Sequence, residues 1–384
     1  MLMMSHFGEH EWKRFDEIAL GDWMIIRRGA RAFFGNVDLE YAVEAAKKRV
    51  TISKRPDAMT FIQYPTRMST ELAEFLAMIV AEGYFGERGA LSFTQKSPEI
   101  LSRFLTLTAL LFGVTPSIKR QAGRVPFARI QNVLLQAYLE ALGVSWGRSA
   151  SKFVPECILS APEECVKCFV STLIGLEGNV YRASRSKVSF DLTMASRILI
   201  DQLHVLLLNF GIVATKREKW SMATNGLRVK RQYYRLCVTG RSNIEALSNL
   251  GVYEYRKQHL LIDGNLSDAT ARDWIPQARR HIQGFMREMQ RAGFPLKSTL
   301  DHSQWRMARA IAGGNKTGVR ELTYAFAKRL TSYAEELGFS GESTNWIKDR
   351  ISEGYAYDPV VCIQTEGTNP LPVHLSDFCL CLTR

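Results

Sequence analysis

Two stretches of the sequence repeat the same landmarks, and this internal repeat constrains the fold more than any other feature. The first is Leu72–Phe85, in which about ten mostly apolar residues lead into Glu82-Gly83. The second is Cys168–Val180, which has the same layout and ends with Glu177-Gly178. Each predicts a largely buried helix with an acidic residue and a glycine at its C-terminal end.

The agreement between the two stretches continues downstream in the same order. The paired landmarks are Ser92–Ser97 with Ser189–Ser196, Leu110–Val114 with Leu207–Ile212, Ser117–Arg120 with Ala214–Arg217, Phe127–Asn132 with Tyr234–Val238, and Leu142–Val144 with Leu250–Val252. A longer hairpin around Asn225-Gly226 accounts for the extra residues of the second copy. Coincidence between two unrelated segments does not explain so many ordered matches. The sequence therefore predicts an α+β fold with two pseudo-symmetric αββαββα halves and antiparallel sheets.

The charge balance favours a polyanionic partner. The chain of 384 residues carries a formal net charge of +12, and Lys and Arg that neutralise phosphates release counterions and favour binding. A merely basic protein is the alternative. No apolar run approaches the ~20 residues of a membrane-spanning helix. The start of the sequence also lacks the layout of a signal peptide, so we expect a cytoplasmic protein that does not contact membranes.

The cysteines do not predict a disulfide framework, because there are seven of them. Cys165 and Cys168 form a Cys-x2-Cys pair, but no second pair stands at metal-binding spacing. We therefore interpret the cysteines as reduced, half-buried thiols rather than zinc ligands.

The repeated helices resemble the motifs of the LAGLIDADG homing endonucleases, in which a helix ends in an acidic residue followed by Gly. Here these residues are Glu82-Gly83 and Glu177-Gly178. Ser151–Ile158 also resembles the Lys-x-x-Pro block that precedes the second motif in inteins. The resemblance covers roughly residues 68 to 265. It implies a two-motif, single-chain nuclease that works as a monomer on double-stranded DNA.

The flanking segments resemble the splicing domain of an intein. Trp12–Ile26 is similar to the segment before the nuclease insertion, and Tyr357–Ile363 to the strand where the splicing domain resumes. Splicing needs Cys or Ser at the first position and His-Asn at the end, whereas this sequence has Met1 and Arg384. We therefore expect no splicing, and interpret the chain as a decayed intein or as a freestanding nuclease descended from one.

The resemblance assigns Glu82 and Glu177 as ligands of Mg²⁺ or Mn²⁺, with the Ala81 and Leu176 carbonyls as further ligands. Phosphodiester hydrolysis needs an activated water and neutralised charge, which a divalent metal supplies. A helix C-terminus carries partial negative charge that favours a cation. We expect Gly83 and Gly178 to end the helices in left-handed conformations. The alternative for each Glu is a solvated acid at a helix end.

The contact between the two helices needs small residues. Ala77 and Ala81 satisfy this in the first motif, whereas the second has Thr172 and a bulky Leu176 at the matching positions. Leu176 departs from the family pattern and leaves the metal geometry open.

Two lysines, Lys152 and Lys257, follow the Leu-Gly-Val landmarks at comparable places. The resemblance gives them a catalytic role, in which they organise water and steady the charge that develops on phosphate. The alternative is a solvated surface lysine, which stands equal to the catalytic role for Lys257, whereas the surrounding block supports the catalytic role of Lys152.

Basic and amide side chains of the strands are candidates for DNA contacts. A concave ribbon of strands fits the major groove, where Arg and Gln can read bases, while other residues contact only phosphate. The candidates are Lys119, Arg120, Arg129 and Gln131 in the first half, and Arg182, Arg185, Lys187, Lys216, Arg217, Lys219, Arg228, Lys230 and Arg235 in the second.

Residues 266 to 352 lack strand alternation and predict helices over 275–291 and 319–337. Arg279, Arg280 and Arg287 lie on a basic face that would extend the DNA footprint. A packing domain with a solvated face is an equal alternative.

These observations divide the chain into five segments. They are an N-terminal segment with an intein-like remnant (1–64), the first half (65–150), the second half (151–265), a helical domain (266–352) and a C-terminal strand remnant (353–384). The function that we expect is site-specific double-strand DNA cleavage. A catalytically silent DNA-binding regulator or an RNA maturase on the same fold is the alternative, and a self-splicing element is disfavoured.

Overall fold

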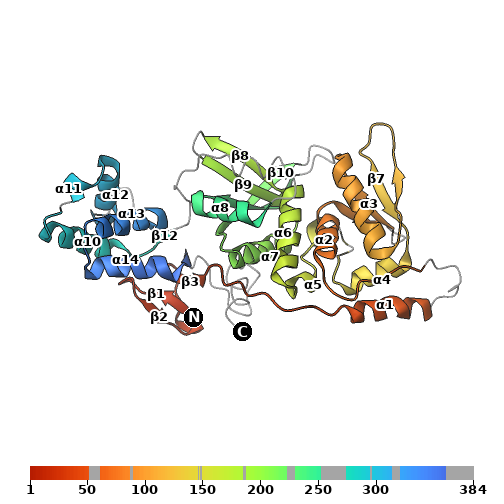
Figure 1. The fold of residues 1–384 in the computed structure, drawn as a ribbon, viewed down its shortest axis with the longest axis horizontal. Coiled ribbons are helices and arrows are strands. Elements are labelled where there is room, and N and C mark those ends of the chain that lie inside the picture. Colours follow the sequence, from red (N-terminus) through yellow and green to blue (C-terminus); the bar gives the residue numbers. More distant parts are fainter. Residues whose placement is uncertain are drawn as a thin grey trace.

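The computed structural model describes most of the chain and has three parts, which Figure 1 shows side by side. A group of helices stands at one end, two units of sheet and helices at the other, and a small sheet lies beside the helical group. The described residues are 1–51, 61–86, 90–145, 147, 149–184, 187–222, 230–251, 274–294, 296–313 and 321–359.

The first half consists of three helices and a four-stranded antiparallel sheet. In chain order these are α2 (Thr70–Glu82), β4 (Gly83–Phe85), β5 (Leu91–Thr94), α3 (Pro98–Phe112), β6 (Ser117–Lys119), β7 (Phe127–Ile130) and α4 (Val133–Ala141). The strand order in the sheet is β4-β5-β7-β6.

The second half repeats this arrangement. Its elements are α6 (Glu163–Glu177), β8 (Asn179–Ser184), β9 (Lys187–Met194), α7 (Arg197–Asn209), β10 (Ala214–Met222), β11 (Lys230–Thr239) and α8 (Arg241–Leu250). The sheet order β8-β9-β11-β10 is that of the first half. Both halves therefore have the αββαββα order that the sequence repeat predicts. Short helices η3 (Ser149–Ser151) and α5 (Glu156–Leu159) connect them.

Matching local signals begin and end the helices of the two halves. The side chains of Ser69, Ser97 and Ser196 accept hydrogen bonds from the backbone of the first turns of α2, α3 and α7. Gly113 and Gly211, which follow α3 and α7, have φ of 66° and 81°. Glycine adopts such positive φ values without steric cost, so both glycine landmarks of the repeat end a helix.

A single hydrophobic core runs through both halves, and α2 packs against α6 along its centre. Phe75 and Phe104 stack in the first half with ring centroids 5.4 Å apart, and Phe169 and Phe190 are fully buried in the second. Helix α1 (Glu40–Thr51) packs against α4 and contributes to this core. The predicted N-terminal segment 1–64 is therefore divided, because α1 belongs to this core and the residues before it belong largely to a separate small sheet.

The two ends of the described chain meet in one small sheet. Strands β1 (Leu2–Met4), β2 (His10–Trp12), β3 (Trp23–Arg27) and β14 (Tyr355–Pro359) have the order β14-β3-β1-β2, and helix η1 (Phe15–Glu17) lies between β2 and β3. Strand β14 runs antiparallel to β3, with Tyr355 opposite Arg27. The described parts of the two segments that resemble the splicing domain therefore pair with each other, while residues 360–384 of the C-terminal segment lie outside the described residues.

The helical domain packs on this sheet through a second core. It contains α10 (Arg279–Arg291), α11 (Leu296–Thr299), α12 (His302–Gly313), α13 (Tyr324–Glu336) and α14 (Glu342–Glu353). A two-stranded antiparallel sheet of β12 (Trp274–Ile275) and β13 (Leu322–Thr323), which are separated in the chain by α10 to α12, adds strand structure that the sequence did not predict. The helix expected over 319–337 starts at Tyr324, because Thr323 caps it. Within the described residues, no helix is long and apolar enough to cross a membrane.

Candidate active site at the ends of two paired helices

The C-terminal ends of α2 and α6 share one cation, the ammonium group of Lys152. Its Nζ donates hydrogen bonds to the carbonyl oxygens of Val80 at 2.7 Å and Ala81 at 2.8 Å. The carboxylates of Glu177 and Glu82 both act electrostatically on the same ammonium group. The repeat thus places its two matched acids around a single half-buried lysine.

The loop that carries Lys152 is fixed to the second half. The hydroxyl of Ser196, which also caps α7, donates to the carbonyl oxygen of Lys152. Two residues further on, the backbone N–H of Val154 donates to Oε1 of Gln202 at 2.7 Å. Because both anchors belong to α7 and its cap, the second half holds the lysine against the end of the first half's helix.

Burial and charge oppose each other in this cluster. Burial raises the pKa of Glu82, although the side chain keeps contact with solvent and the Lys152 ammonium pulls that pKa down. Burial lowers the pKa of Lys152, while Glu177 and Glu82 raise it. Both groups are therefore held where their charged forms depend on each other. Perturbed pKa values of this kind cluster at functional sites, and structural ion-pair networks also produce them.

The two glycines do not end the helices in left-handed conformations, and our expectation on this point is wrong. Gly83 and Gly178 have φ of −74° and −76°, in extended conformations. Space explains why glycine stands there. A Cβ at Gly83 would lie 2.4 Å from the Ile79 carbonyl oxygen, and one at Gly178 would lie 2.3 Å from the Phe190 ring. The glycines allow each helix to pass directly into its first strand.

The packing of α2 and α6 uses the small residues that the sequence indicated in the first helix. Ala77 is fully buried, and Ala81 is nearly so. In the second helix Thr172 is buried, whereas Leu176 is only partly buried and packs on the edge of the core. The bulky side chain of Leu176 is therefore accommodated without full burial.

The donor set at these helix ends fits a hard divalent cation in part. Two carboxylates, of Glu82 and Glu177, together with main-chain carbonyls, are oxygen ligands of the kind that Mg²⁺ and Mn²⁺ accept beside water and phosphate. The Ala81 carbonyl, however, already accepts the Lys152 ammonium. Among the described residues, no cluster of three or more His, Cys, Asp or Glu side chains could hold a metal.

The Cys165 and Cys168 thiols lie on α6 away from this cluster. Burial raises the pKa of each to about 11, and the Cys168 thiol donates to the Thr70 carbonyl oxygen at 3.3 Å. Both are free cysteines.

A comparison with models of protein families finds a similarity within the second half. Residues 164–250 match the model of the LAGLIDADG-like domain. The matched region runs from the start of α6 to the end of α8, and thus contains Glu177 and the whole second sheet.

Curated proteins of unrelated names match larger parts of the chain. The replication factor C small subunit of Methanocaldococcus jannaschii is 27% identical over 197 residues, which are 50% of this chain and 10% of that protein. The glutamine–fructose-6-phosphate aminotransferase of the same organism is 22% identical over 167 residues, or 42% and 15%. The replicative DNA helicase DnaB of Nostoc sp. is 22% identical over 287 residues, or 70% and 29%. The chain spans less than a third of each of these relatives.

Solved structures resemble the chain weakly. Full-length DUF199/WhiA from Thermatoga maritima has a TM-score of 0.34 and 12% identity, covering 83% of this chain and 97% of that one. I-DmoI in complex with DNA and Mn has a TM-score of 0.32 and 15% identity, covering 48% and 98%.

In the second half, strand alternation divides the basic candidates between two faces of the sheet. Arg217 and Lys219 are exposed, on the face opposite the buried Leu236 and Val238. Lys216 points to the other face, where its Nζ lies 2.7 Å from the Asp201 carboxylate of α7. Of these three candidates, Arg217 and Lys219 therefore lie on the solvent-exposed face of the sheet, which we call the open face.

Arg235 shares the open face, but its guanidinium is engaged within the protein. It forms an ion pair with Asp191 and donates to the Tyr181 hydroxyl at 3.4 Å. Arg231, opposite Ser221, lies on the same exposed face and was not a candidate, although its odd position in β11 indicates this orientation.

For the remaining candidates of the second half, the structure gives only exposure or position in a strand. Arg182 and Lys230 are exposed, and Lys187 begins β9. Arg185, Arg228 and the catalytic candidate Lys257 lie outside the described residues.

The first half presents a smaller basic face. Lys119 and Arg129 are exposed on the side of the sheet away from the buried Ala128 and Ile130. Arg120 and Gln131 are exposed just beyond the ends of β6 and β7. Tyr84, also 60% exposed, adds an aromatic ring near Arg129, because both pair with Ser92.

In the helical domain, Arg279 is exposed, but its guanidinium is engaged within the protein. Its guanidinium donates to the carbonyl oxygens of Ala312 and Gly313 at the end of α12, at 3.2 and 3.3 Å. Arg280 is exposed.

Sequence reasoning missed the ion pair that ties α2 to α3. Glu74 is buried, and both of its carboxylate oxygens accept from the Arg103 guanidinium, at 3.0 and 2.6 Å. An acid inside an apolar helix was the signal, since a buried carboxylate needs a partner.

Proposed function

We propose that this protein is a metal-dependent, site-specific endonuclease that cuts both strands of duplex DNA. One observation carries the proposal. The two acids that the sequence repeat aligns, Glu82 and Glu177, lie at the ends of two packed helices and act on the same ammonium group. Two matched carboxylates at one junction suit a reaction that is carried out once on each strand.

The residues at the helix ends divide the chemistry between them. Glu82 and Glu177 would hold Mg²⁺ or Mn²⁺, which when bound supplies an activated water and neutralises charge on the leaving oxygen. Lys152, held by Ala81 and by the loop anchors on α7, keeps a positive charge at the junction for the phosphate. Its contact with Ala81 fixes the position of that charge without help from the substrate.

The DNA would lie across the open faces of the two sheets. These faces carry exposed basic residues in both halves, among them Arg129, Arg217 and Lys219. A duplex bound in this way passes the helix junction that separates the two sheets. Because both halves belong to one chain, the protein would act as a monomer.

A second candidate function is DNA binding without cleavage. The hydrogen bond from Lys152 to the Ala81 carbonyl favours it, because a ligand that a metal would use is already occupied. Leu176, a bulky residue where the resemblance leads us to expect a small one, favours it as well.

We further propose that the chain derives from an intein. Its curated relatives have unrelated names, and it spans only 10% to 29% of those described above. A segment shared in this way between a helicase, an aminotransferase and a replication factor behaves as an insertion. The pairing of β3 with β14 supports this origin, because the segments that resemble the splicing domain belong to one sheet.

Cleavage of a randomised duplex library with Mg²⁺ tests the main proposal, with Glu82→Gln and Glu177→Gln as variants. Glutamine keeps the size of each side chain and removes its charge. We expect discrete double-strand cuts from the unmodified chain and none from either variant, while duplex binding in EDTA persists in all three. Tight, salt-sensitive binding without cleavage by the unmodified chain would establish the second candidate instead.

A further inference from the structure

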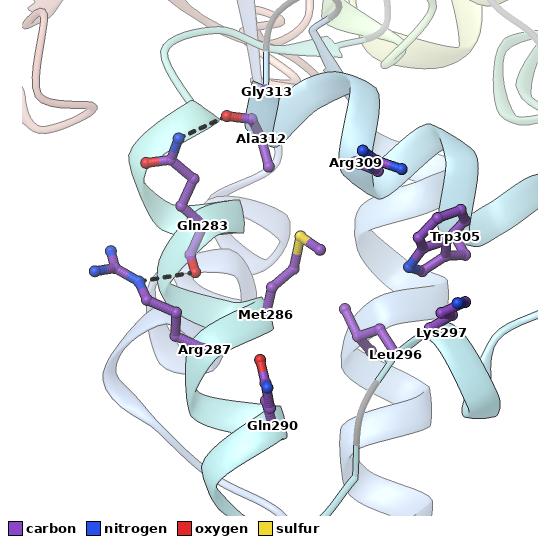
Figure 2. Close-up of a pocket in the computed structure, with 10 residues that line it drawn as sticks. All are labelled: Gln283, Met286, Arg287, Gln290, Leu296, Lys297, Trp305, Arg309, Ala312 and Gly313. Carbon is purple, nitrogen blue, oxygen red and sulfur yellow. Dashed lines mark hydrogen bonds between the residues drawn. The ribbon is translucent and has the colours of Figure 1, made fainter.

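The helical domain contains a pocket of about 750 Å³ between α10, α11 and α12. Figure 2 shows Met286 on α10 facing Trp305 and Arg309 on α12, with Leu296 and Lys297 of α11 below them. The pocket lies in a different core from the helix junction, and none of the sites described above uses it.

The charge around the pocket is positive. Three cationic side chains, of Arg287, Lys297 and Arg309, are among the ten residues that line it, and none of those ten is acidic. All three are exposed. Arg287 stands at the outer rim, where its Nε donates to the Gln283 carbonyl oxygen. A ligand that enters between α10 and α12 would therefore need negative charge to be bound well.

The interior of the pocket is apolar and carries an aromatic ring. Met286 and Trp305 are half-buried, and Leu296 is buried. The Arg309 guanidinium lies 5.3 Å from the Trp305 ring centroid, a distance typical of a cation–π contact. The indole therefore has a cation over one of its faces, which leaves its other face for a ligand, and the Met286 thioether lies across the pocket from it.

An aromatic platform beside cations is the combination with which proteins bind unpaired nucleotides. A base stacks on the ring, and the adjoining phosphate is neutralised by Lys or Arg. We propose that this pocket binds a nucleotide of a DNA strand, with the base against Trp305 and Met286 and the phosphate beside Lys297 and Arg309. This inference rests on the proposed DNA-binding function, because that function supplies a strand near the domain.

The chosen probe separates this pocket from the sheet faces. We would measure binding of the full chain, in EDTA, to a fluorescent oligothymidylate of about twelve nucleotides and to an abasic strand of equal length. The two strands carry the same charge and differ only in their bases. We expect the unmodified chain to prefer the thymidylate by about tenfold, which corresponds to one stacked base.

Variants then assign this preference to the pocket. Trp305→Leu should abolish the preference for bases, and Trp305→Phe, which retains a ring, should preserve most of it. Arg309→Gln should weaken the binding of both oligonucleotides, the thymidylate and the abasic strand. Lys328→Gln removes an exposed cation from α13 of the same domain, outside the pocket, and should leave the base preference unchanged. Circular dichroism confirms that each variant is folded.

Three outcomes would overturn the inference. The first is an unmodified chain that binds both strands equally. The second is a Trp305→Leu variant that keeps the base preference. The third is thymidine monophosphate that competes as well as the strand, because the pocket would then be a site for free nucleotides. Loss of cleavage by Glu82→Gln is independent of all three, so failure of the nuclease proposal remains distinguishable.

Discussion

The ammonium group of Lys152 lies 2.8 Å from the carbonyl oxygen of Ala81, so a residue that follows the first half's last helix caps the end of its first helix. This contact crosses the molecule at the junction of α2 and α6. It joins a backbone acceptor of one motif to a side chain that the second half holds in place.

Lys152→Met should lower both stability and cleavage. The Val80 and Ala81 carbonyls would lose a charged donor, which costs about 1–3 kcal/mol. Urea denaturation measures the first effect, and single-turnover cleavage of a duplex measures the second. Lys152→Arg, which keeps the charge, serves as the control and should retain most of the stability. Unchanged stability in the methionine variant would mean that the contact is not formed in solution.

Gly178→Ala should destabilise the protein by about 1–3 kcal/mol, because overpacking forces neighbours to shift. The new methyl group would lie 2.3 Å from the Phe190 ring and 2.5 Å from the Ile174 carbonyl oxygen. Gly86→Ala is a matched control, since its nearest neighbour would be 3.8 Å away. Thermal denaturation of both variants checks the difference, and equal midpoints would contradict the close approach of α6 to its strand.

Arg217→Gln should affect DNA binding and Lys216→Gln should affect stability, although the residues are adjacent. Loss of Arg217 from the open face should weaken duplex binding and reduce the slope of log K against log salt by about one. Loss of Lys216 should leave this slope unchanged and cost about 1 kcal/mol of stability, because Asp201 loses a partner. Duplex titrations at several salt concentrations decide this. An equal loss of binding would place both side chains on the DNA.

Stability should fall between neutral and mildly acidic pH because of His10. Burial and the Arg350 guanidinium lower its pKa to about 4, although the Glu353 carboxylate lies 3.5 Å away. The unfolded chain takes up a proton near pH 6.5 that the folded chain refuses, so stability is lost as pH falls from about 6.5 towards 4.

The loss should reach about 1–2 kcal/mol at pH ~5, measured by urea denaturation at pH values on both sides of this range. His10→Gln should remove this part of the pH dependence. His302→Gln, which changes an exposed histidine, should leave it intact. A pH profile that is the same in the unmodified chain and His10→Gln would show that His10 is charged in the folded protein.

The sequence predicted the order of elements in both halves, because five ordered landmarks mark where helices and strands begin and end. It predicted less of the site. Lys152 was identified through a family motif, but its contact with Ala81 depends on the packing of α2 against α6. The faces of Lys216 and Arg217 could have been separated from strand alternation alone.

Other features depend on contacts between distant residues, which the sequence pattern does not reveal. The reason for glycine after each motif lies in the distance to Phe190 and Ile79, so a local rule for helix ends gave the wrong conformation. The contact of the Arg279 guanidinium with the end of α12 joins residues more than thirty positions apart in the chain. The place of α1 beside α4 likewise arises only in the folded core.

The pairing of β3 with β14 determines the path of the chain. The chain leaves the small sheet after Arg27 and re-enters it at Tyr355, directly opposite. Both halves and the helical domain therefore belong to one long chain segment that connects two neighbouring strands, β3 and β14. Such a segment can be lengthened, shortened or exchanged as a unit while β3 and β14 keep their positions.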